Sequence, residues 1–412
     1  MAAATQAYQR GDYAEAEKLY LAALEEAKKA DPKDSRLATT LNNLALLHQA
    51  QGHSERAQAL FEQAAELLEN ARGRTLADLA TVLNNLAQLL HQQKDYPRAE
   101  GYLRQAVDIR EKTLGAEHPE TATALNNLGV LLLDSGRAGE AEAFLERALA
   151  IREKTLGPEH PATAAVLNNL GEAYRSRGRF TRARPLFERS LALREKTLGP
   201  EHPEVATVLV NLALLCHEQG AYAQAEAFYR RALAIREKAL GSDDIKVAMA
   251  LKTFAELYQI QGRYAEAEPL LQRALAIREK VQGTDHPEVA DSLNGLGAIY
   301  QYQNRLEEAE ALFQRALAIQ EKALGPNHAD LAATLNNLAR VYGFQGRYSE
   351  AENAYQRLLT LQENTLGKAH PKVALTLEGL AETYRALGKP GKAEAAENRA
   401  RKLRGNPGSP TP

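Results

Sequence analysis

The chain has 412 residues, and its 51 lysines and arginines against 53 aspartates and glutamates give a formal charge of −2. This balance argues against a general nucleic-acid binder, and the longest apolar runs are too short to span a membrane. The sequence holds one cysteine, no tryptophan and 6% aromatic residues. A single cysteine excludes an internal disulfide and a cysteine-based zinc site, and it fits a reducing compartment, so we expect a cytoplasmic protein.

A period of 42 residues runs along the chain. The leucine that opens Leu41-Asn42-Asn43-Leu44-Ala45 recurs at positions 83, 125, 167, 209, 251, 293, 335 and 377. An alanine recurs at the same step from 57 to 393, and a glycine recurs from 73 to 367. A fixed period of this length is typical of repeat proteins, in which each unit packs only against its neighbours.

The period divides the chain into three parts. Residues 1–34 form a partial first repeat, in which Gly11 precedes a helix and the residues before it supply only the end of a partner helix. Residues 35–403 hold nine full repeats, which we expect to form one continuous array. Residues 404–412 are so rich in glycine and proline that we expect a disordered tail.

Each repeat is interpreted as two helices, as the segment from Pro119 to Leu156 illustrates. Pro119 suits the first turn of a helix, and apolar residues then follow at helical spacing until Gly136. Glycine ends helices because it adopts the left-handed conformation at little cost, and Gly157 closes the second helix. The pattern predicts an all-α fold, an α-solenoid of about ten helix hairpins without strands.

Another residue fills the position of Gly136 in two repeats. Asn304 tolerates the left-handed conformation better than most residues, so we expect the same turn there. Lys94 is a poor choice for this conformation, and we expect a strained or looser turn at that place.

The recurring positions resemble the tetratricopeptide repeat (TPR): a large residue before Leu and Gly or Ala in the first helix, then Tyr, Gly, Ala and an aromatic residue. The 42-residue length and the linker Arg-Glu-Lys-x-Leu-Gly-x-x-His-Pro are similar to the kinesin light chain branch, most closely over 211–220 and 228–233. The resemblance implies a right-handed superhelix whose first helices line a concave groove for extended peptides. Kinesin light chains also have a heptad segment and a basic groove, which this sequence lacks, so we do not expect a motor-adaptor role.

Two asparagines recur in the first helix of most repeats. On a helical wheel, Asn126 lies about 110° and Asn127 about 150° from the centre of the apolar stripe, so the second asparagine points outward. A side-chain amide can both donate to and accept from a peptide main chain. We therefore predict a peptide-binding row, while an alternative is that the amides tie adjacent repeats together or bond within their own helix. The predicted row is Asn43, Asn85, Asn127, Asn169, Asn211 and Asn337.

Thr253, Gly295 and Gly379 interrupt this row, so we expect the strongest peptide site in the first half of the chain. Other outward positions carry polar, charged and aromatic side chains, and no sign of charge dominates. Two aromatic residues in an aromatic-poor protein could hold an apolar side chain of the ligand, or pack against the next helix. The additional predicted contacts are Gln88, Glu172, Arg175, Tyr302 and Phe344.

Histidine and cysteine offer no pattern for catalysis. Because the linker histidines lie one repeat apart without cysteines or paired carboxylates at ligand spacing, we interpret them as helix-start residues. Cys216 lies on the core stripe, and we expect a buried, inert thiol. We therefore expect a protein that is not an enzyme and that has no catalytic residue, metal site or cofactor. The linker histidines are His118, His160, His202, His286, His328 and His370.

The Arg-Glu-Lys runs that close the second helices, such as Arg110-Glu111-Lys112, place cations at negative helix ends. Their glutamates largely cancel the charge, so we expect a solvated face rather than a basic stripe.

Two functions fit these observations. The first is a non-enzymatic scaffold that binds extended peptide segments of partner proteins, with no nucleic acid or membrane as a partner. The alternative is a sensor or regulatory module separated from an effector such as an ATPase, a protease or a transcription regulator. Neither the identity of the partner nor the oligomeric state follows from the sequence.

Overall fold

The computed structural model describes residues 1–30, 35–69 and 75–404 of the chain. Over these residues the regular elements are twenty α-helices, which confirms the predicted all-α solenoid class. The linker glycine at position 73 and the glycine- and proline-rich residues 405–412 lie outside the described part. The chain forms two compact units, unit 1 (residues 1–219) and unit 2 (residues 220–412).

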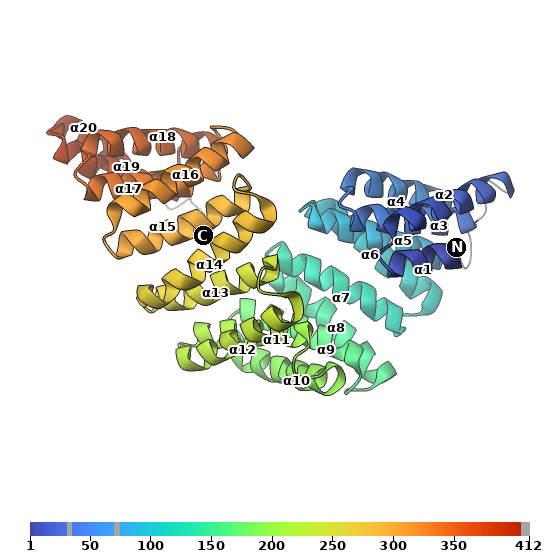
Figure 1. The fold of residues 1–412 in the computed structure, drawn as a ribbon. Helices are drawn as coiled ribbons and strands as arrows, with labels where there is room; N and C mark the ends of the chain where they lie inside the picture. Colours follow the sequence, from blue (N-terminus) through green and yellow to red (C-terminus); the bar gives the residue numbers. More distant parts are fainter. Residues whose placement is uncertain (31–34, 70–74, 405–412) are drawn as a thin grey trace. The chain divides into compact units, whose positions relative to one another are not determined.

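Unit 1 is a stack of helix hairpins, in which the two helices of one repeat pack most closely against each other (Figure 1). The short first helix is followed by helices of 16 to 19 residues. The helices are α1 (Ala2–Gln9), α2 (Tyr13–Ala30), α3 (Ser35–Ala50), α4 (Ser54–Glu69), α5 (Thr75–Gln92), α6 (Tyr96–Leu114), α7 (Pro119–Asp134), α8 (Ala138–Leu156), α9 (Pro161–Ser176), α10 (Phe180–Leu198) and α11 (Pro203–Glu218).

Unit 2 repeats the same hairpin from α13 onward, with the odd-numbered helices in the first position of each repeat (Figure 1). Its helices are α12 (Tyr222–Leu240), α13 (Ile245–Ile260), α14 (Tyr264–Gln282), α15 (Pro287–Tyr302), α16 (Leu306–Leu324), α17 (Leu331–Phe344), α18 (Tyr348–Leu366), α19 (Pro371–Ala386) and α20 (Pro390–Arg404).

The predicted start and stop signals act as expected in the hairpin of α7 and α8. Helix α7 begins at Pro119, and the Nδ1 atom of the preceding His118 accepts a hydrogen bond from the Glu120 amide at 3.2 Å. Gly136 follows the end of α7 with φ of +77°, and Gly157 follows the end of α8 with φ of +93°. Both φ values lie in the left-handed region, which residues with a side chain rarely adopt, and this explains why glycine occupies both positions.

Glycine inside the first helices lets the second helix approach closely. A methyl group built on Gly171 would lie 2.8 Å from Cε1 of Phe187, and one on Gly129 would lie 2.5 Å from Cγ of Leu145. These separations are shorter than a van der Waals contact, so a large side chain packs directly on the helix backbone. Because the two helices of a repeat lie this close, side chains of the size of leucine and phenylalanine fill the space between them, and tryptophan is not needed.

The turn at Lys94 is strained and keeps the usual form. Lys94 has φ of +63° and Asn304 has φ of +61°, so both adopt the left-handed conformation. The Lys94 amide donates to the His91 carbonyl at 2.9 Å, as the Gly136 amide donates to the Leu133 carbonyl at 2.9 Å. The turn is therefore no looser than its glycine counterpart, and the cost is a lysine in a conformation unfavourable by about 1–2 kcal/mol.

The prediction of a solvated face is wrong for the arginines of the Arg-Glu-Lys runs. Arg110, Arg194 and Arg278 are buried. Nη1 of Arg194 donates to the Glu204 carbonyl at 2.7 Å, and Arg278 makes the same bond to Glu288 at 2.9 Å. The long side chain reaches from the end of one repeat to the first helix of the next, so it serves as an inter-repeat link.

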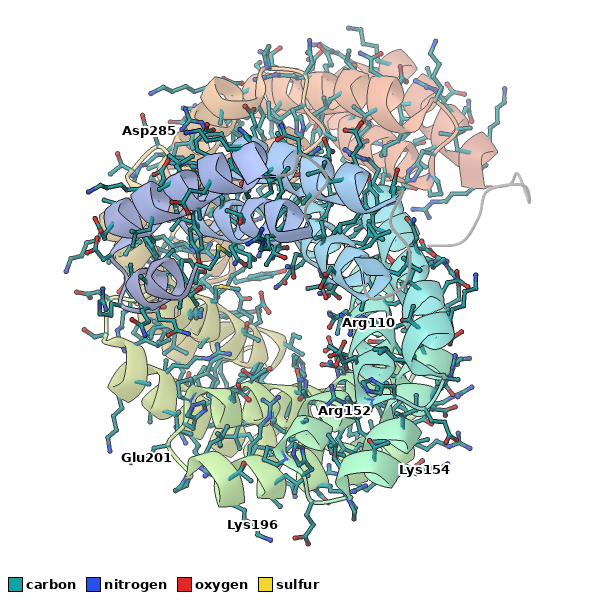
Figure 2. All side chains as sticks on the ribbon, turned by 90° about the vertical axis from the view of Figure 1, so that its right-hand side faces the viewer. Arg110, Arg152, Lys154, Lys196, Glu201 and Asp285 are labelled. Atoms are coloured by element: carbon teal, nitrogen blue, oxygen red, sulfur yellow. The ribbon has the colours of Figure 1, made fainter. Side chains whose placement is uncertain are left out.

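The lysines of these runs do remain exposed, at the ends of α8 and α10 (Figure 2). Lys154 pairs with Glu117 at 2.5 Å, and Lys196 pairs with Glu159 at 2.7 Å, each one linker earlier in the chain. Exposed ion pairs of this kind contribute little stability individually. The repeats are therefore held mainly by core packing and by the buried arginines.

Candidate functional site

A row of side-chain hydrogen bonds joins the first helices of unit 1. In each bond, the second asparagine of one repeat donates from Nδ2 to Oδ1 of the first asparagine in the preceding repeat. The interpretation in which these amides tie adjacent repeats is therefore confirmed, and the peptide-binding role remains a prediction. The amide row consists of the bonds Asn85–Asn42 (2.9 Å), Asn127–Asn84 (2.7 Å), Asn169–Asn126 (2.9 Å) and Asn211–Asn168 (2.9 Å).

Within the amide row, Asn85, Asn127 and Asn169 are half-buried, whereas Asn211 is buried. Val210 takes the position of the first asparagine beside Asn211, so it supplies no side-chain acceptor that could extend the row.

Two predicted asparagines lie outside the amide row. Asn43 in α3 is half-buried, and its Oδ1 accepts from Nδ2 of Asn42 at 3.3 Å. Asn337 in α17 is also half-buried, and it makes no side-chain hydrogen bond to the residues that the structure describes.

A small hollow lies between α5 and α7, beside the amide row. Its volume is about 160 Å³, and Gln88 stands exposed on it. His91 fills part of the space, with Nε2 at 2.7 Å from the Asp134 carboxylate. We call it hollow A, lined by Asn84, Ala87, Gln88, His91, Leu103, Asn127 and Val130.

An equivalent hollow lies in unit 2, between α17 and α19. Six of its lining residues stand six repeats after residues of hollow A, so the two hollows occupy the same place in the repeat. Gly343 replaces His91 and leaves open space, and Gly379 replaces Asn127 and admits the Tyr355 ring beneath it. The volume here is about 420 Å³. We call it hollow B, lined by Ala339, Arg340, Gly343, Phe344, Tyr348, Tyr355, Gly379, Glu382, Thr383 and Ala386.

Charged side chains of the predicted site form pairs between repeats. Arg175 of α9 binds Glu218 of α11 through a salt bridge. Glu172 lies one helical turn before Arg175, and burial raises the pKa of its carboxyl group although Arg175 opposes the shift. The two predicted contacts Glu172 and Arg175 thus lie together, with the Arg175 charge compensated by Glu218.

The predicted aromatic contacts are strongly exposed. The side chains of Tyr302 and Phe344 are 60% and 62% exposed, and Ile260 is 62% exposed at the same repeat position. The ring of Tyr302 stacks on Tyr264 at a centroid distance of 4.9 Å and an interplanar angle of 1°. Tyr302 therefore has a packing partner within unit 2, whereas Phe344 contributes to hollow B.

Sequence reasoning missed Ile260, Tyr355 and the two glycines of hollow B. An alignment of the repeats against one another contains the signal, because polar Gln92 and Asp134 occupy in unit 1 the position of Ile260. The glycines leave no positive signal, since they act by removing a side chain.

The histidines and the cysteine occupy structural positions. Nδ1 of each linker histidine accepts a hydrogen bond from the backbone amide two residues later, at 3.1–3.3 Å. In five of them this bond caps the next helix and confirms the helix-start interpretation, whereas His328 lies three residues before Leu331, the first residue of α17, and does not cap it. Cys216 is buried, as predicted. Within the described ranges, no cluster of three histidine, cysteine or acidic residues is arranged to hold a metal ion. None of the helices described has the length and apolar character needed to cross a membrane.

The repeats of this chain match models of a known repeat family. A model of the tetratricopeptide repeat matches residues 2–70, 78–154, 128–196, 163–238, 246–322, 297–364 and 330–405, and a second model of this repeat matches residues 42–112. A search of curated proteins finds no match.

Solved structures show similar repeats. BtubC (BKLC) from P. vanneervenii is 26% identical over 57% of this chain and 94% of its own, with a TM-score of 0.50. A putative kinesin light chain of Podospora anserina with nearly identical TPR-like repeats is 31% identical, over 50% of this chain and 99% of its own, with a TM-score of 0.45. The apo form of the quorum sensor NprR from B. thuringiensis shares the fold at 13% identity, over 89% of this chain and 98% of its own, with a TM-score of 0.60. The chain belongs to the tetratricopeptide repeat family.

Proposed function

We propose that this protein is a non-enzymatic scaffold that binds an extended peptide segment of a partner protein on the face of its first helices. Arrays of this repeat are protein-interaction modules, and their first helices provide extended binding surfaces. The observation that carries the proposal is the amide row, which presents one half-buried amide per repeat along α5, α7 and α9.

The bonds of the amide row support binding because they orient the amides before a ligand arrives. A primary amide has two N–H donors and an oxygen with two lone pairs, so one inter-repeat bond leaves further capacity on each asparagine. Groups held in place before binding lose less conformational entropy when the ligand binds. An amide also suits any main chain, whatever the side chains of the peptide are.

The proposed contacts are those that the sequence predicted. Asn43 and Gln88 flank the amide row at its start, and Glu172 and Arg175 add a charged pair farther along unit 1. Unit 2 offers proposed contacts of its own, which are Asn337, Tyr302 and Phe344.

The proposal is tested by selecting twelve-residue peptides from a random library on the full chain and N-methylating the bound peptides one residue at a time. N-methylation removes a main-chain donor and preserves the side chain. We expect methylation at the contacting residues to weaken binding by about 3- to 10-fold each, the usual net contribution of a hydrogen bond. Unchanged affinity across the whole methylation series would overturn main-chain recognition.

A protein variant completes the test. Asn43→Ala combined with Gln88→Ala removes two proposed contacts and leaves every bond of the amide row in place. This double variant should lose affinity while it stays folded in the binding buffer, with a fall in the free energy of unfolding of about 1 kcal/mol from the lost Asn42–Asn43 bond. Asn336→Ala in unit 2 serves as the control. Equal affinity of the double variant and the wild type would contradict the proposed contacts.

A further inference from the structure

We propose that hollow B is a second binding site, which takes the side chain of a tyrosine from the partner. This inference extends the proposed function, because the tyrosine would belong to the same kind of partner segment. It rests on the volume, the lining side chains and one hydroxyl group of hollow B, which lies between α17 and α19. Both helices are labelled in Figure 1.

The room in hollow B suits a large side chain. Its volume of about 420 Å³ falls within the range of about 300–1,000 Å³ of ligand pockets, whereas hollow A at about 160 Å³ does not. A methyl group built on Gly343 would meet no atom within 4 Å, so the space above α17 is open. A methyl group on Gly379 would lie 2.6 Å from Cζ of Tyr355, so the Tyr355 ring lies directly beneath α19.

The walls of hollow B favour an aromatic ligand. Phe344 and Tyr348 expose their rings, and Ala339 and Ala386 are small residues that leave the rings accessible. Aromatic side chains bind one another in offset or edge-to-face arrangements, which adds to the gain from apolar burial. A protein with 6% aromatic residues concentrates three of them on this one hollow.

The hydroxyl group of Tyr355 in hollow B favours tyrosine over phenylalanine as the ligand side chain. Tyr355 is 9% exposed, and among the described residues no group forms a hydrogen bond with its hydroxyl. The hydroxyl oxygen is not sealed from solvent, so water satisfies it in the free chain and the hydroxyl of a ligand can take the place of that water. A phenol hydroxyl can donate to or accept from the Tyr355 hydroxyl at the floor of the hollow.

The charges around the hollow favour a neutral ligand. Arg340 and Glu382 are exposed on opposite helices, and neither forms an ion pair with another described residue. Burial raises the pKa of the Tyr355 hydroxyl, with Glu382 adding to the shift and Arg340 opposing it, so both charges act on the same atom. Because the two charges have opposite signs, the hollow has no net charge with which to select an anion or a cation, and a neutral phenol loses nothing by binding there.

The inference is tested with N-acetyl-tyrosinamide and N-acetyl-phenylalaninamide, titrated into the full chain and followed by NMR. We expect the tyrosine probe to bind about 2- to 12-fold more tightly, the ratio that one net hydrogen bond produces. Tyr355→Phe should bind both probes equally, because it removes only the hydroxyl. Equal binding of the probes to the wild type, or a preference that persists in Tyr355→Phe, would overturn the inference.

A second pair of variants locates the site. Gly343→Leu places a side chain in the open space of hollow B, and a helical position with no neighbour within 4 Å tolerates it. This variant should lose binding of both probes, and Gly391→Leu should bind them like the wild type because Gly391 lies in α20 outside the hollow. Binding that survives in Gly343→Leu would place the probes elsewhere. The probes carry no extended main chain, so their result is independent of the amide-row test.

Discussion

The position of the second asparagine in the first helix differs in chemistry between hollow A of unit 1 and hollow B of unit 2. At hollow A the position of the second asparagine holds Asn127, whose amide bonds Asn84 at 2.7 Å. Six repeats later that position holds Gly379, which makes no side-chain bond and lets the Tyr355 ring pack beneath α19 at hollow B. The core of both units follows the same period, so the comparison teaches that the exposed face can change its chemistry while the hairpin stays the same.

Cutting the amide row is expected to have the largest effect on stability. Asn168→Leu removes the acceptor of Asn211, and both residues are buried, so the Asn211 amide loses its partner. We expect the free energy of unfolding of unit 1 to fall by about 1–3 kcal/mol, measured by urea denaturation.

The matched control is Asn336→Leu, at the same repeat position in unit 2. Asn336 is half-buried, and the next repeat offers Gly379 instead of an asparagine. This substitution should change the stability by less than about 0.5 kcal/mol. Equal losses in the two variants would show that the amide row contributes no specific stability to unit 1.

The turn between the two helices of a repeat allows a smaller comparison. Lys94→Gly relieves a left-handed lysine beside hollow A and should stabilise the chain by about 1 kcal/mol, as read from the thermal midpoint. Asn304→Gly, at the same position in unit 2, should gain less because asparagine tolerates this conformation. A larger gain at Asn304 than at Lys94 would contradict this explanation of the turn.

The smallest expected effect depends on pH. Burial raises the pKa of Glu172 in the folded chain, so its ionised form costs stability at neutral pH. Glu172→Gln should be more stable than the wild type at pH 7 by less than about 1 kcal/mol. The advantage should vanish as the pH falls below the ordinary carboxyl pKa of 4.5, where both chains carry a neutral side chain. Glu256→Gln, an exposed glutamate at the same repeat position in unit 2, is the control, and an advantage of Glu172→Gln that is unchanged at low pH would refute the assignment.

Much of the fold could be predicted because its signals are local. Gly136, Gly157 and His118 each act on backbone groups a few residues away, so their positions in the sequence specify where helices begin and end. The outward angle of Asn127 was also predictable from the helical period. Its bond to Asn84 was left as one of two alternatives, since a contact 43 residues away depends on the offset between neighbouring repeats.

Two features could not be predicted for distinct physical reasons. Arg194 is charged and lies in a charged run, yet its long side chain satisfies the Glu204 carbonyl of the next repeat and is buried there. Hollow B depends on Gly343, which leaves open space above α17, and on Gly379, which admits the Tyr355 ring beneath α19. The effect of a missing side chain can be worked out only once the neighbouring helices are placed.

The central claim is that the amide row links the first helices of neighbouring repeats in unit 1 and also offers its remaining amide capacity to a partner. The most direct test is NMR of the asparagine side-chain NH2 groups in the wild-type chain, with and without a library-selected peptide. We expect slow hydrogen exchange at Asn85, Asn127, Asn169 and Asn211, fast exchange at Asn337, and peptide-induced shifts at Asn85, Asn127 and Asn169. Exchange as fast in the row as at Asn337, with no shift on peptide addition, would contradict the account.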